Sequence, residues 1–216
     1  MLRKILTTGL AAGVVAGIIV SVAQMVAVNP LIAQAERLEA AASQPGGQSG
    51  GEVAWQPAAG LERTGYTVLT NVLTGTGFGL LLAGCFVVCG RSVNGRRGLL
   101  WGLGGFAAFA LAPALGLPPE APGAVAPELS LRQGWWLGAV AGTASGLALL
   151  VFAPARWLKA LGVLLLVLPH AIGAPPHGGG VAPELAGNFV IASLATTALF
   201  WLVLGGLSGA VYRRLA

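Results

Sequence analysis

Six long apolar runs, separated by short polar segments, dominate the chain. They lie at about residues 5 to 28, 66 to 89, 98 to 115, 135 to 153, 157 to 172 and 189 to 212. Most of them approach the roughly 20 residues that a helix needs to cross a bilayer. The pattern predicts an all-α integral membrane protein with six transmembrane helices.

The fifth run is the shortest, because Pro169 interrupts it. Only the residues from Trp157 to Leu168 precede the proline, which gives about 18 Å of helix. A helix here crosses the membrane only if it continues past Pro169. The alternative is a re-entrant segment, and the sequence leaves both open.

The composition agrees with a membrane protein. Hydrophobic residues make up 56% of the chain, charged residues 9%, and the mean hydropathy is +0.81, whereas soluble domains carry about 25% charged residues. We expect one transmembrane domain over residues 1–216, with an expanded outer loop at 33–57. In that loop, residues 33–42 are predicted to be helical and residues 43–51 flexible.

The charged residues predict the orientation, because short cytoplasmic loops are rich in Lys and Arg. With six spans, nine basic residues and no acid fall on one side: Arg3, Lys4, Arg91, Arg96, Arg97, Arg156, Lys159, Arg213 and Arg214. All seven glutamates fall on the other side with three arginines, so the two sides carry +9 and −4, consistent with the net charge of +5. We therefore expect both termini in the cytoplasm, an uncleaved first span rather than a signal peptide, and no nucleic-acid partner.

A proline-rich segment occurs twice and suggests an internal repeat. Each copy closes an apolar run with a proline, continues through a double proline and ends in Val-Ala-Pro-Glu-Leu, at 125–129 and 181–185. If each copy is an outer turn between two spans, the six helices form three hairpins. Glycines four residues apart, at 9, 13 and 17, at 75 and 79, and at 138, 142 and 146, predict close helix packing.

No charged residue or histidine lies in the middle of a span, so polar chemistry inside the membrane depends on hydroxyls and amides. Hydroxyl and amide residues recur in the second helix of each expected hairpin: Thr67, Thr70, Asn71, Thr74 and Thr76; Thr143 and Ser145; Ser193, Thr196 and Thr197. They either bond neighbouring helices or line a polar pathway. Cys85 and Cys89 are read as packing residues, with a thiolate metal site as the alternative.

The candidate metal ligands lie on the outer face. His170 and His177 are the only histidines and belong to the second proline-rich copy. Neutral imidazole binds Co, Ni, Cu and Zn, and the outer glutamates Glu62, Glu120 and Glu184 could complete a loose site; ordinary interfacial histidines are the alternative. The sequence contains no Walker A loop and no nucleophile with a base, so we expect no enzyme and no permanently bound cofactor.

Three motifs, in order, closely resemble the CbtA family of predicted cobalt transporter subunits. They are G-L-P-P-E at 116–120, R-Q-x-W-W at 132–136 and P-H-x-I-G-A-P at 169–175, and the resemblance runs nearly end to end. It implies an inner-membrane, multi-pass protein that imports Co²⁺ for cobalamin synthesis with CbtB, a small single-span partner bearing histidines. It also implies roles for His170, Glu62 and Glu120, and for Trp135 as an interfacial anchor.

The chain departs from the family pattern in its first outer loop. Many family members carry a histidine-rich run there, and residues 35–56 of this chain contain no histidine. Metal capture then depends on His170, His177, the glutamates or a partner. The rival hypotheses are transport of another divalent metal or a small polar solute, and a non-transporting scaffold; a homo-oligomer is also compatible with the many small residues.

Overall fold

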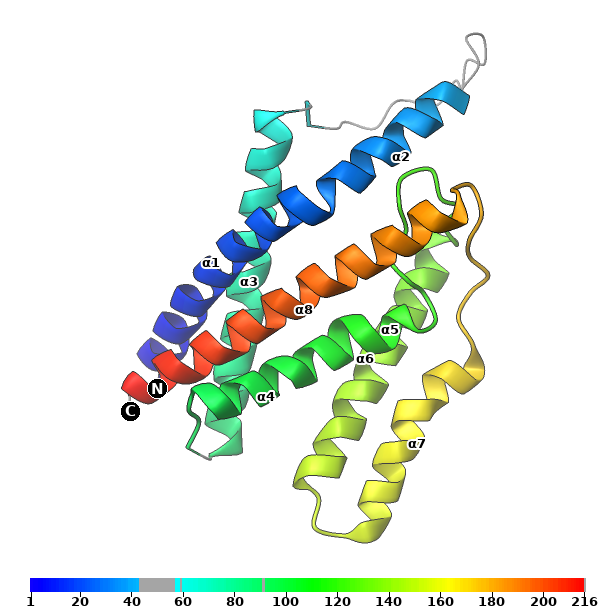
Figure 1. Cartoon of the computed structure of the whole chain (residues 1–216). Helices are drawn as coiled ribbons and strands as arrows, with labels where there is room; N and C mark the ends of the chain where they lie inside the picture. The colour runs from blue at the N-terminus through cyan, green and yellow to red at the C-terminus, as the bar shows by residue number, and fades with distance from the viewer. Residues whose placement is uncertain (43–56, 59, 91, 216) are drawn as a thin grey trace.

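The computed structural model describes residues 1–42, 57–58, 60–90 and 92–215, and their regular secondary structure is helical throughout (Figure 1). The predicted flexible stretch at 43–51, Glu52 and Arg91 lie outside the described residues. The helices are α1 Leu2–Ala27, α2 Asn29–Ala42, α3 Leu61–Cys89, α4 Gly95–Phe106, the π-helix η1 Ala107–Leu111, α5 Ala112–Ala114, α6 Leu129–Phe152, α7 Arg156–Ile172 and α8 Pro183–Arg214.

Each predicted apolar run is helical, and four helices are long and apolar enough to cross a membrane. These are α1, α3, α6 and α8. The third run consists of α4, η1 and α5, which follow one another without a break from Gly95 to Ala114. In the fifth run, α7 continues past Pro169 to Ile172 and has 17 residues, about 25 Å at 1.5 Å per residue. Membrane crossing by these last two segments stays a prediction.

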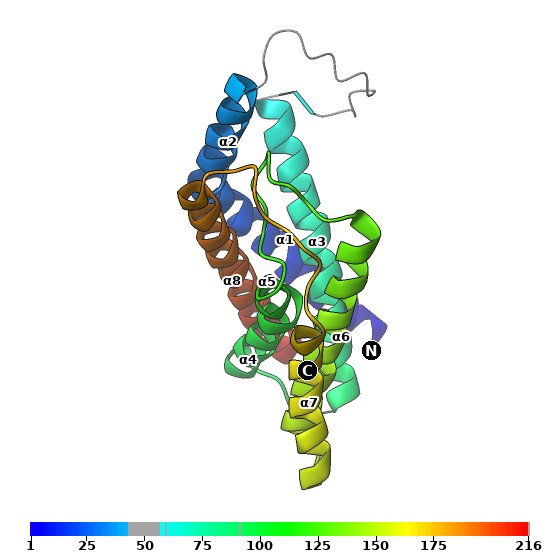
Figure 2. The ribbon, with the colours of Figure 1, turned by 90° about the vertical axis from the view of Figure 1, so that its right-hand side faces the viewer.

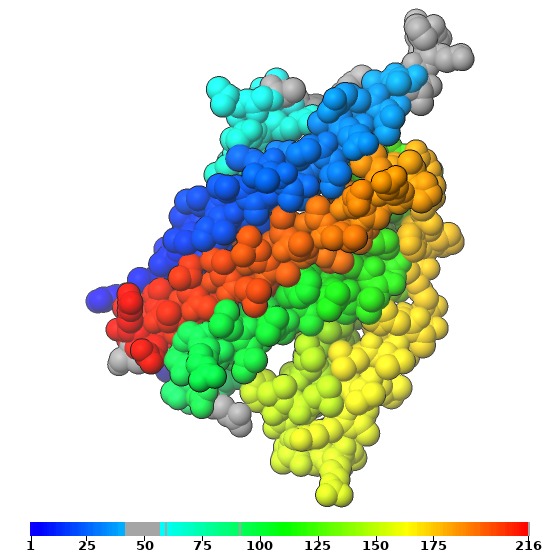
Figure 3. Space-filling view, in the orientation of Figure 1, coloured from blue at the N-terminus to red at the C-terminus, as the bar shows by residue number. Residues whose placement is uncertain are grey.

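The helices pack in pairs that differ from the expected hairpins. The first expected pair, α1 with α3, packs along its length, and α8 packs on α1 and α4. Figure 3 shows α8 lying between α1 and α4 across one face of the molecule. In the expected second hairpin α4 barely touches α6, and α7 packs on α6 instead of α8. Of the expected third span, η1 and α5 do pack on α6, but α7 and α8 do not form a packed pair, so the three-hairpin arrangement is not confirmed.

Glycines explain which helices pair. Gly13 of α1 and Gly75 of α3 meet backbone to backbone, as do Gly9 and Gly79, so a Cβ at any of them would overlap the neighbouring main chain. The same close approach joins Gly98 and Gly102 of α4 to the main chain of α8 at residues 201–209. Small residues let membrane helices approach closely enough for extensive van der Waals contact. The α4–α8 pairing follows from this contact.

The π-helix η1 ends at a proline. The N–H of Ala112 bonds the carbonyl of Ala107 five residues back, and Pro113 follows with no N–H of its own. A proline ring clashes with the carbonyl four residues before it, and a wider turn relieves that clash. Phe109 and Ala110 of this π-helix both line a cavity between the helices.

The two proline-rich copies meet at one end of the molecule. The Val125 N–H donates to the Gly179 carbonyl over 3.2 Å, and Gly180 lies against the main chain of Gly123. In Figure 2 the two turns run beside each other over the ends of the helices. A separate apolar cluster supports them there, made of Val28, Ala35, Ala121, Leu185 and Phe189.

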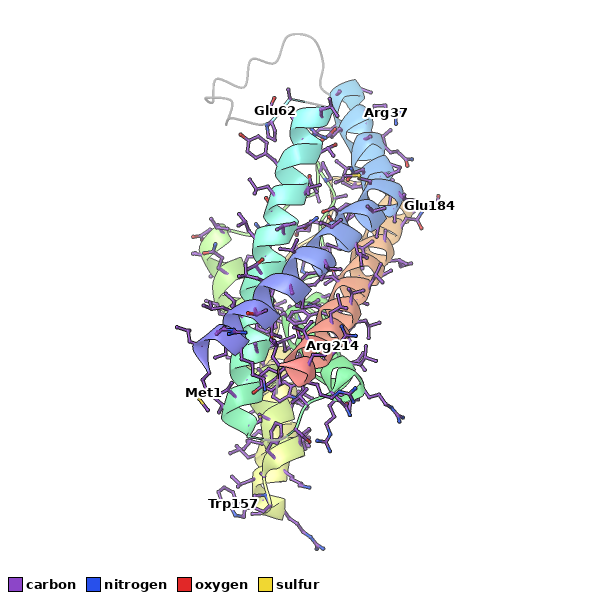
Figure 4. The ribbon with its side chains drawn as sticks, turned by 90° about the vertical axis from the view of Figure 1, so that its left-hand side faces the viewer. Met1, Arg37, Glu62, Trp157, Glu184 and Arg214 are labelled. Atoms are coloured by element: carbon purple, nitrogen blue, oxygen red, sulfur yellow. The ribbon has the colours of Figure 1, made fainter. Side chains whose placement is uncertain are left out.

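Acidic and basic helix ends lie at opposite ends of the described structure. Figure 4 places Glu62 and Glu184 toward one end, where the proline-rich turns also lie, and Met1 and Trp157 toward the other. The chain termini lie together at the basic end (Figure 1). A membrane protein with this charge pattern requires its acidic and basic helix ends to lie apart in this way. Which of the two ends faces the cytoplasm stays a prediction.

Candidate functional site

The five predicted metal ligands do not converge. Among the described residues, no group of three His, Cys, Asp or Glu side chains lies close enough to hold a metal ion. They are spread over the ends of α3, α7 and α8 and over both proline-rich turns: Glu62, His170, Glu184, Glu120 and His177. Each therefore has to be considered by its own surroundings.

His170 is half-buried and already engaged at both ring nitrogens. Nδ1 lies 3.1 Å from the Leu166 carbonyl oxygen, one turn back in α7, and Nε2 lies 3.0 Å from the Ala112 carbonyl oxygen of α5. A neutral imidazole has one N–H and donates to one of these oxygens at a time, whereas the imidazolium donates to both. His170 thus joins α7 to the end of the third apolar run. It could bind a metal only if one ring nitrogen first lost its contact with a carbonyl oxygen.

Trp135 completes the surroundings of His170. The two rings meet edge to face with centroids 6.0 Å apart. The indole also lies directly over Gly116, where a Cβ would collide with it. Its Nε1 is buried and has no hydrogen-bond partner in the described structure. The sequence motifs at 116–120, 132–136 and 169–175 therefore come together as one packed unit.

Glu120 keeps an oxygen that could contact a cation. Its Oε2 pairs with Arg132 at 3.2 Å, and its side chain is 19% exposed. Its Oε1 is buried and has no hydrogen-bond partner in the described residues. Of the five candidates, Glu120 is the carboxylate with a partly desolvated, unused acceptor beside the His170–Trp135 unit.

The other three candidates lie in open surroundings. The Glu62 carboxylate accepts a hydrogen bond from the Ala58 N–H at 3.3 Å at the start of α3. His177 is exposed, with Nδ1 3.1 Å from the Pro175 carbonyl oxygen. Glu184 is exposed in the first turn of α8. They provide acidic and imidazole groups without forming a chelating site.

A cavity inside the helix bundle gathers polar side chains from α1, α3 and α8. Its volume is ≈ 250 Å³. We call it the amide cavity and define it by its lining residues: Val20, Gln24, Asn71, Thr74, Phe78, Phe109, Ala110, Trp136, Thr197, Phe200 and Trp201. Within apolar membrane helices such a cavity is the natural place for polar chemistry.

A hydrogen-bond chain orients the amides of this cavity. The Ser21 hydroxyl donates to the Gly17 carbonyl at 2.7 Å, so it must accept from Asn71, whose Nδ2 lies 3.0 Å away. The second Asn71 N–H donates to Gln24 Oε1 at 2.7 Å. Since a carbonyl oxygen only accepts, the donor and the acceptor of each of these three hydrogen bonds are fixed. The Asn71 Oδ1 is left without a partner in the described residues.

Aromatic rings form the remaining walls. Phe109 stacks on Trp201 with centroids 5.5 Å apart, and Phe78 packs against both rings at 4.9 and 4.8 Å. Trp136 lies 6.3 Å from Phe109 and faces the cavity, while the preceding Trp135 faces His170. The two tryptophans thus connect the outer His170 unit with the amide cavity.

Sequence reasoning found part of this cavity. The polar residues Asn71, Thr74 and Thr197 were named as members of hydroxyl and amide faces, and Ser21 and Gln24 of α1 were missed. Their signal is a serine and a glutamine three residues apart near the end of an apolar run. Other hydroxyls serve packing: Thr196 bonds the Ala192 carbonyl of its own helix at 2.9 Å.

Comparison with known proteins gives one family. The family described as "Probable cobalt transporter subunit (CbtA)" matches residues 2–213 of the chain. No curated protein and no solved structure matches.

Proposed function

Because this chain belongs to the CbtA family of probable cobalt transporter subunits, we propose that it carries Co²⁺ inward across the inner membrane of the cell. The apolar helices make it a multi-pass membrane protein. In this proposal it is a transport subunit and not an enzyme. Co²⁺ is its substrate, and the metal it delivers feeds cobalamin synthesis.

The proposed topology has six spans and cytoplasmic termini. It is supported by the positive charges gathered at one end of the helices, since basic loops stay in the cytoplasm. The third span is then α4, η1 and α5 together, and α7 is the fifth. With this topology the proline-rich turns, Glu120 and His170 lie on the outer side, where the metal arrives.

The observation that carries the function is the amide cavity. Polar groups from three helices converge inside spans that are otherwise apolar, and unsatisfied polar groups in a membrane are costly unless a ligand or water meets them. The cavity residues on α1 and η1 lie near the ends of those segments that face the acidic side. A cation attracted by the outer glutamates would pass Glu120 and the His170–Trp135 unit before reaching the cavity.

The five outer residues then act as a loose entrance. Glu62, Glu184 and His177 concentrate cations, and Glu120 offers its unused oxygen. His170 binds Co²⁺ by exchanging the Ala112 carbonyl for the metal, which would loosen α7 from α5 as the ion enters. Imidazole and carboxylate are both ligands that suit Co²⁺.

A CbtB-like subunit is the proposed partner. Its support in this chain is the absence of histidine from residues 35–56, which leaves capture by clustered imidazoles to another protein. The exposed small residues also suit assembly with that subunit or with further copies of this chain. The membrane potential would suffice to drive uptake, since a divalent cation gains about 4.6 kcal/mol per 100 mV.

A flux experiment tests the proposal. The protein, with and without its partner, is placed in vesicles, and Co²⁺ entry is followed with an internal metal-sensitive dye while an inside-negative potential is imposed or collapsed. We expect entry that increases with the potential and that is faster for Co²⁺ than for Ni²⁺ or Zn²⁺ at equal external concentrations. No entry under any potential, with the partner present, would identify a scaffold, and preference for another ion would change the substrate.

A further inference from the structure

We propose that the amide cavity binds its cation as the hydrated ion, through the water ligands rather than through direct metal bonds. This inference rests on the proposed function and names the form of the substrate at one site. The site consists of the amides of Gln24 and Asn71, the hydroxyls of Thr74 and Thr197, and the surrounding aromatic rings.

The first argument is the set of donor atoms. None of the lining residues is Asp, Glu, His, Cys or Met, so the cavity lacks the side chains that replace water on Co²⁺. What it offers is a few neutral oxygens. Such oxygens cannot supply a complete coordination shell, but they readily accept hydrogen bonds from water molecules polarised by a metal.

The second argument is the direction of the hydrogen-bond chain. The Gly17 carbonyl fixes Ser21 as a donor, and Ser21 in turn fixes the Asn71 amide, whose two N–H groups are both used. The unused atom of Asn71 is therefore its carbonyl oxygen. This amide has been set by its neighbours to accept, which is what a metal-bound water requires of its partner.

The third argument is size. Six waters at their share of liquid volume, roughly 30 Å³ each, occupy about 180 Å³. The cavity of ≈ 250 Å³ has room for a cation with this first shell.

The fourth argument is the aromatic wall. Phe78, Phe109 and Trp201 pack within 5.5 Å of one another, centroid to centroid, beside the polar groups. The negative faces of aromatic rings attract cations, and Trp does so most strongly. Neutral oxygens and ring faces hold a cation weakly enough to release it, which transport requires.

Recognition through water predicts loose selectivity at this step. Divalent ions with six tightly held waters present nearly the same outer surface, so the amide cavity would distinguish them poorly. Discrimination between Co²⁺ and its competitors must then occur at groups that bind metal directly, such as Glu120, His170 or the partner.

Cobalt(III) hexaammine tests the inference, because its six ammonia ligands donate hydrogen bonds and do not exchange. Its binding to the purified protein is measured by calorimetry and its inhibition of Co²⁺ entry is measured in vesicles. We expect binding and inhibition in the native chain, and at least tenfold weaker binding in Asn71→Leu and in Thr197→Val. Thr70→Val, on the exposed face one position before Asn71, is the matched control and should behave as the native chain.

The outcomes separate the two proposals. Co²⁺ entry that hexaammine does not inhibit, or hexaammine binding that Asn71→Leu and Thr197→Val both leave unchanged, would overturn the hydrated-ion site while leaving transport intact. Hexaammine binding that depends on Asn71 in a protein that moves no Co²⁺ would support the site and overturn the transport function. For each variant, the elution volume of the detergent-solubilised protein and its helix content show whether it has folded. If one of the two variants does not fold, the other provides the test of the site.

Discussion

The contact between α4 and α8 predicts opposite effects for two alanine substitutions in the same helix. At Gly98 a Cβ would collide with the Gly205 carbonyl oxygen and would lie 2.9 Å from the Gly209 Cα and 3.0 Å from the Gly209 nitrogen. At Gly104 a Cβ would meet no atom within 4 Å. Gly98→Ala and Gly104→Ala therefore differ in packing and are matched in helix propensity.

The magnitude follows from the distances. Carbon atoms pack at about 3.5 Å or more, and the Gly205 carbonyl oxygen lies closer than the Gly209 atoms, so α4 and α8 must separate by more than about 0.5 Å at Gly98, which forfeits roughly a quarter to a half of the dispersion energy of the contacts affected. Overpacking of this kind costs about 1–3 kcal/mol, while Gly to Ala within a helix gains up to about 1 kcal/mol. We expect Gly104→Ala to be more stable than Gly98→Ala by about 1–3 kcal/mol, at least fivefold in the unfolding constant.

Reversible unfolding in mixed detergent micelles measures this difference. The mole fraction of SDS is increased, helix content is followed by circular dichroism, and tertiary packing by tryptophan fluorescence, since Trp201 is buried beside this contact. Equal midpoints for the two variants, or a higher midpoint for Gly98→Ala, would refute the backbone contact between α4 and α8.

Two further predictions concern the outer side. His170→Ala removes the one hydrogen bond that a neutral imidazole can donate to a carbonyl and should cost about 0.6 kcal/mol of stability, the typical value of a membrane hydrogen bond, while lowering Co²⁺ entry at limiting metal. Lost stability with unchanged entry would make His170 a purely structural residue. Glu120→Gln should lower the initial entry rate severalfold with less than about 1 kcal/mol of destabilisation, because its partner Arg132 is partly exposed. The control is Glu128→Gln, because the Glu128 carboxylate is exposed and accepts a hydrogen bond from Ser130. An equal fall of the entry rate in both variants would show that the general negative field matters and not Glu120 itself.

The sequence predicts the helices well because apolar length alone determines them. The apolar runs and the helix at 33–42 were visible in the sequence, whereas the proline at 169 left open whether the fifth run continues beyond it. Helix pairing was not visible, because these helices are apolar on most faces and lipid contact is as favourable as protein contact. Glycines four residues apart indicate which face of α1, α3 and α6 can approach another helix closely, but they do not indicate which helix packs there.

The candidate site was predictable in residue type and not in geometry. His170 looked like a free ligand because the sequence does not show that the Ala112 carbonyl lies 3.0 Å from it. Asn71 looked like one of many polar residues because its importance comes from Ser21 and Gln24, which are 50 and 47 positions away. Contacts over such separations depend on the tertiary fold, which no local pattern encodes.

The pairing of α4 with α8 also affects the order in which the protein can assemble. As the chain is synthesised, α1 can pair with α3, and α6 with α7, soon after the second helix of each pair has been made. The glycine face of α4 must wait until α8 has been made, after α6 and α7. During that interval α4 is an unpaired helix with its main chain open to lipid or to another protein. Correct folding of this transporter subunit is therefore completed by its last helix.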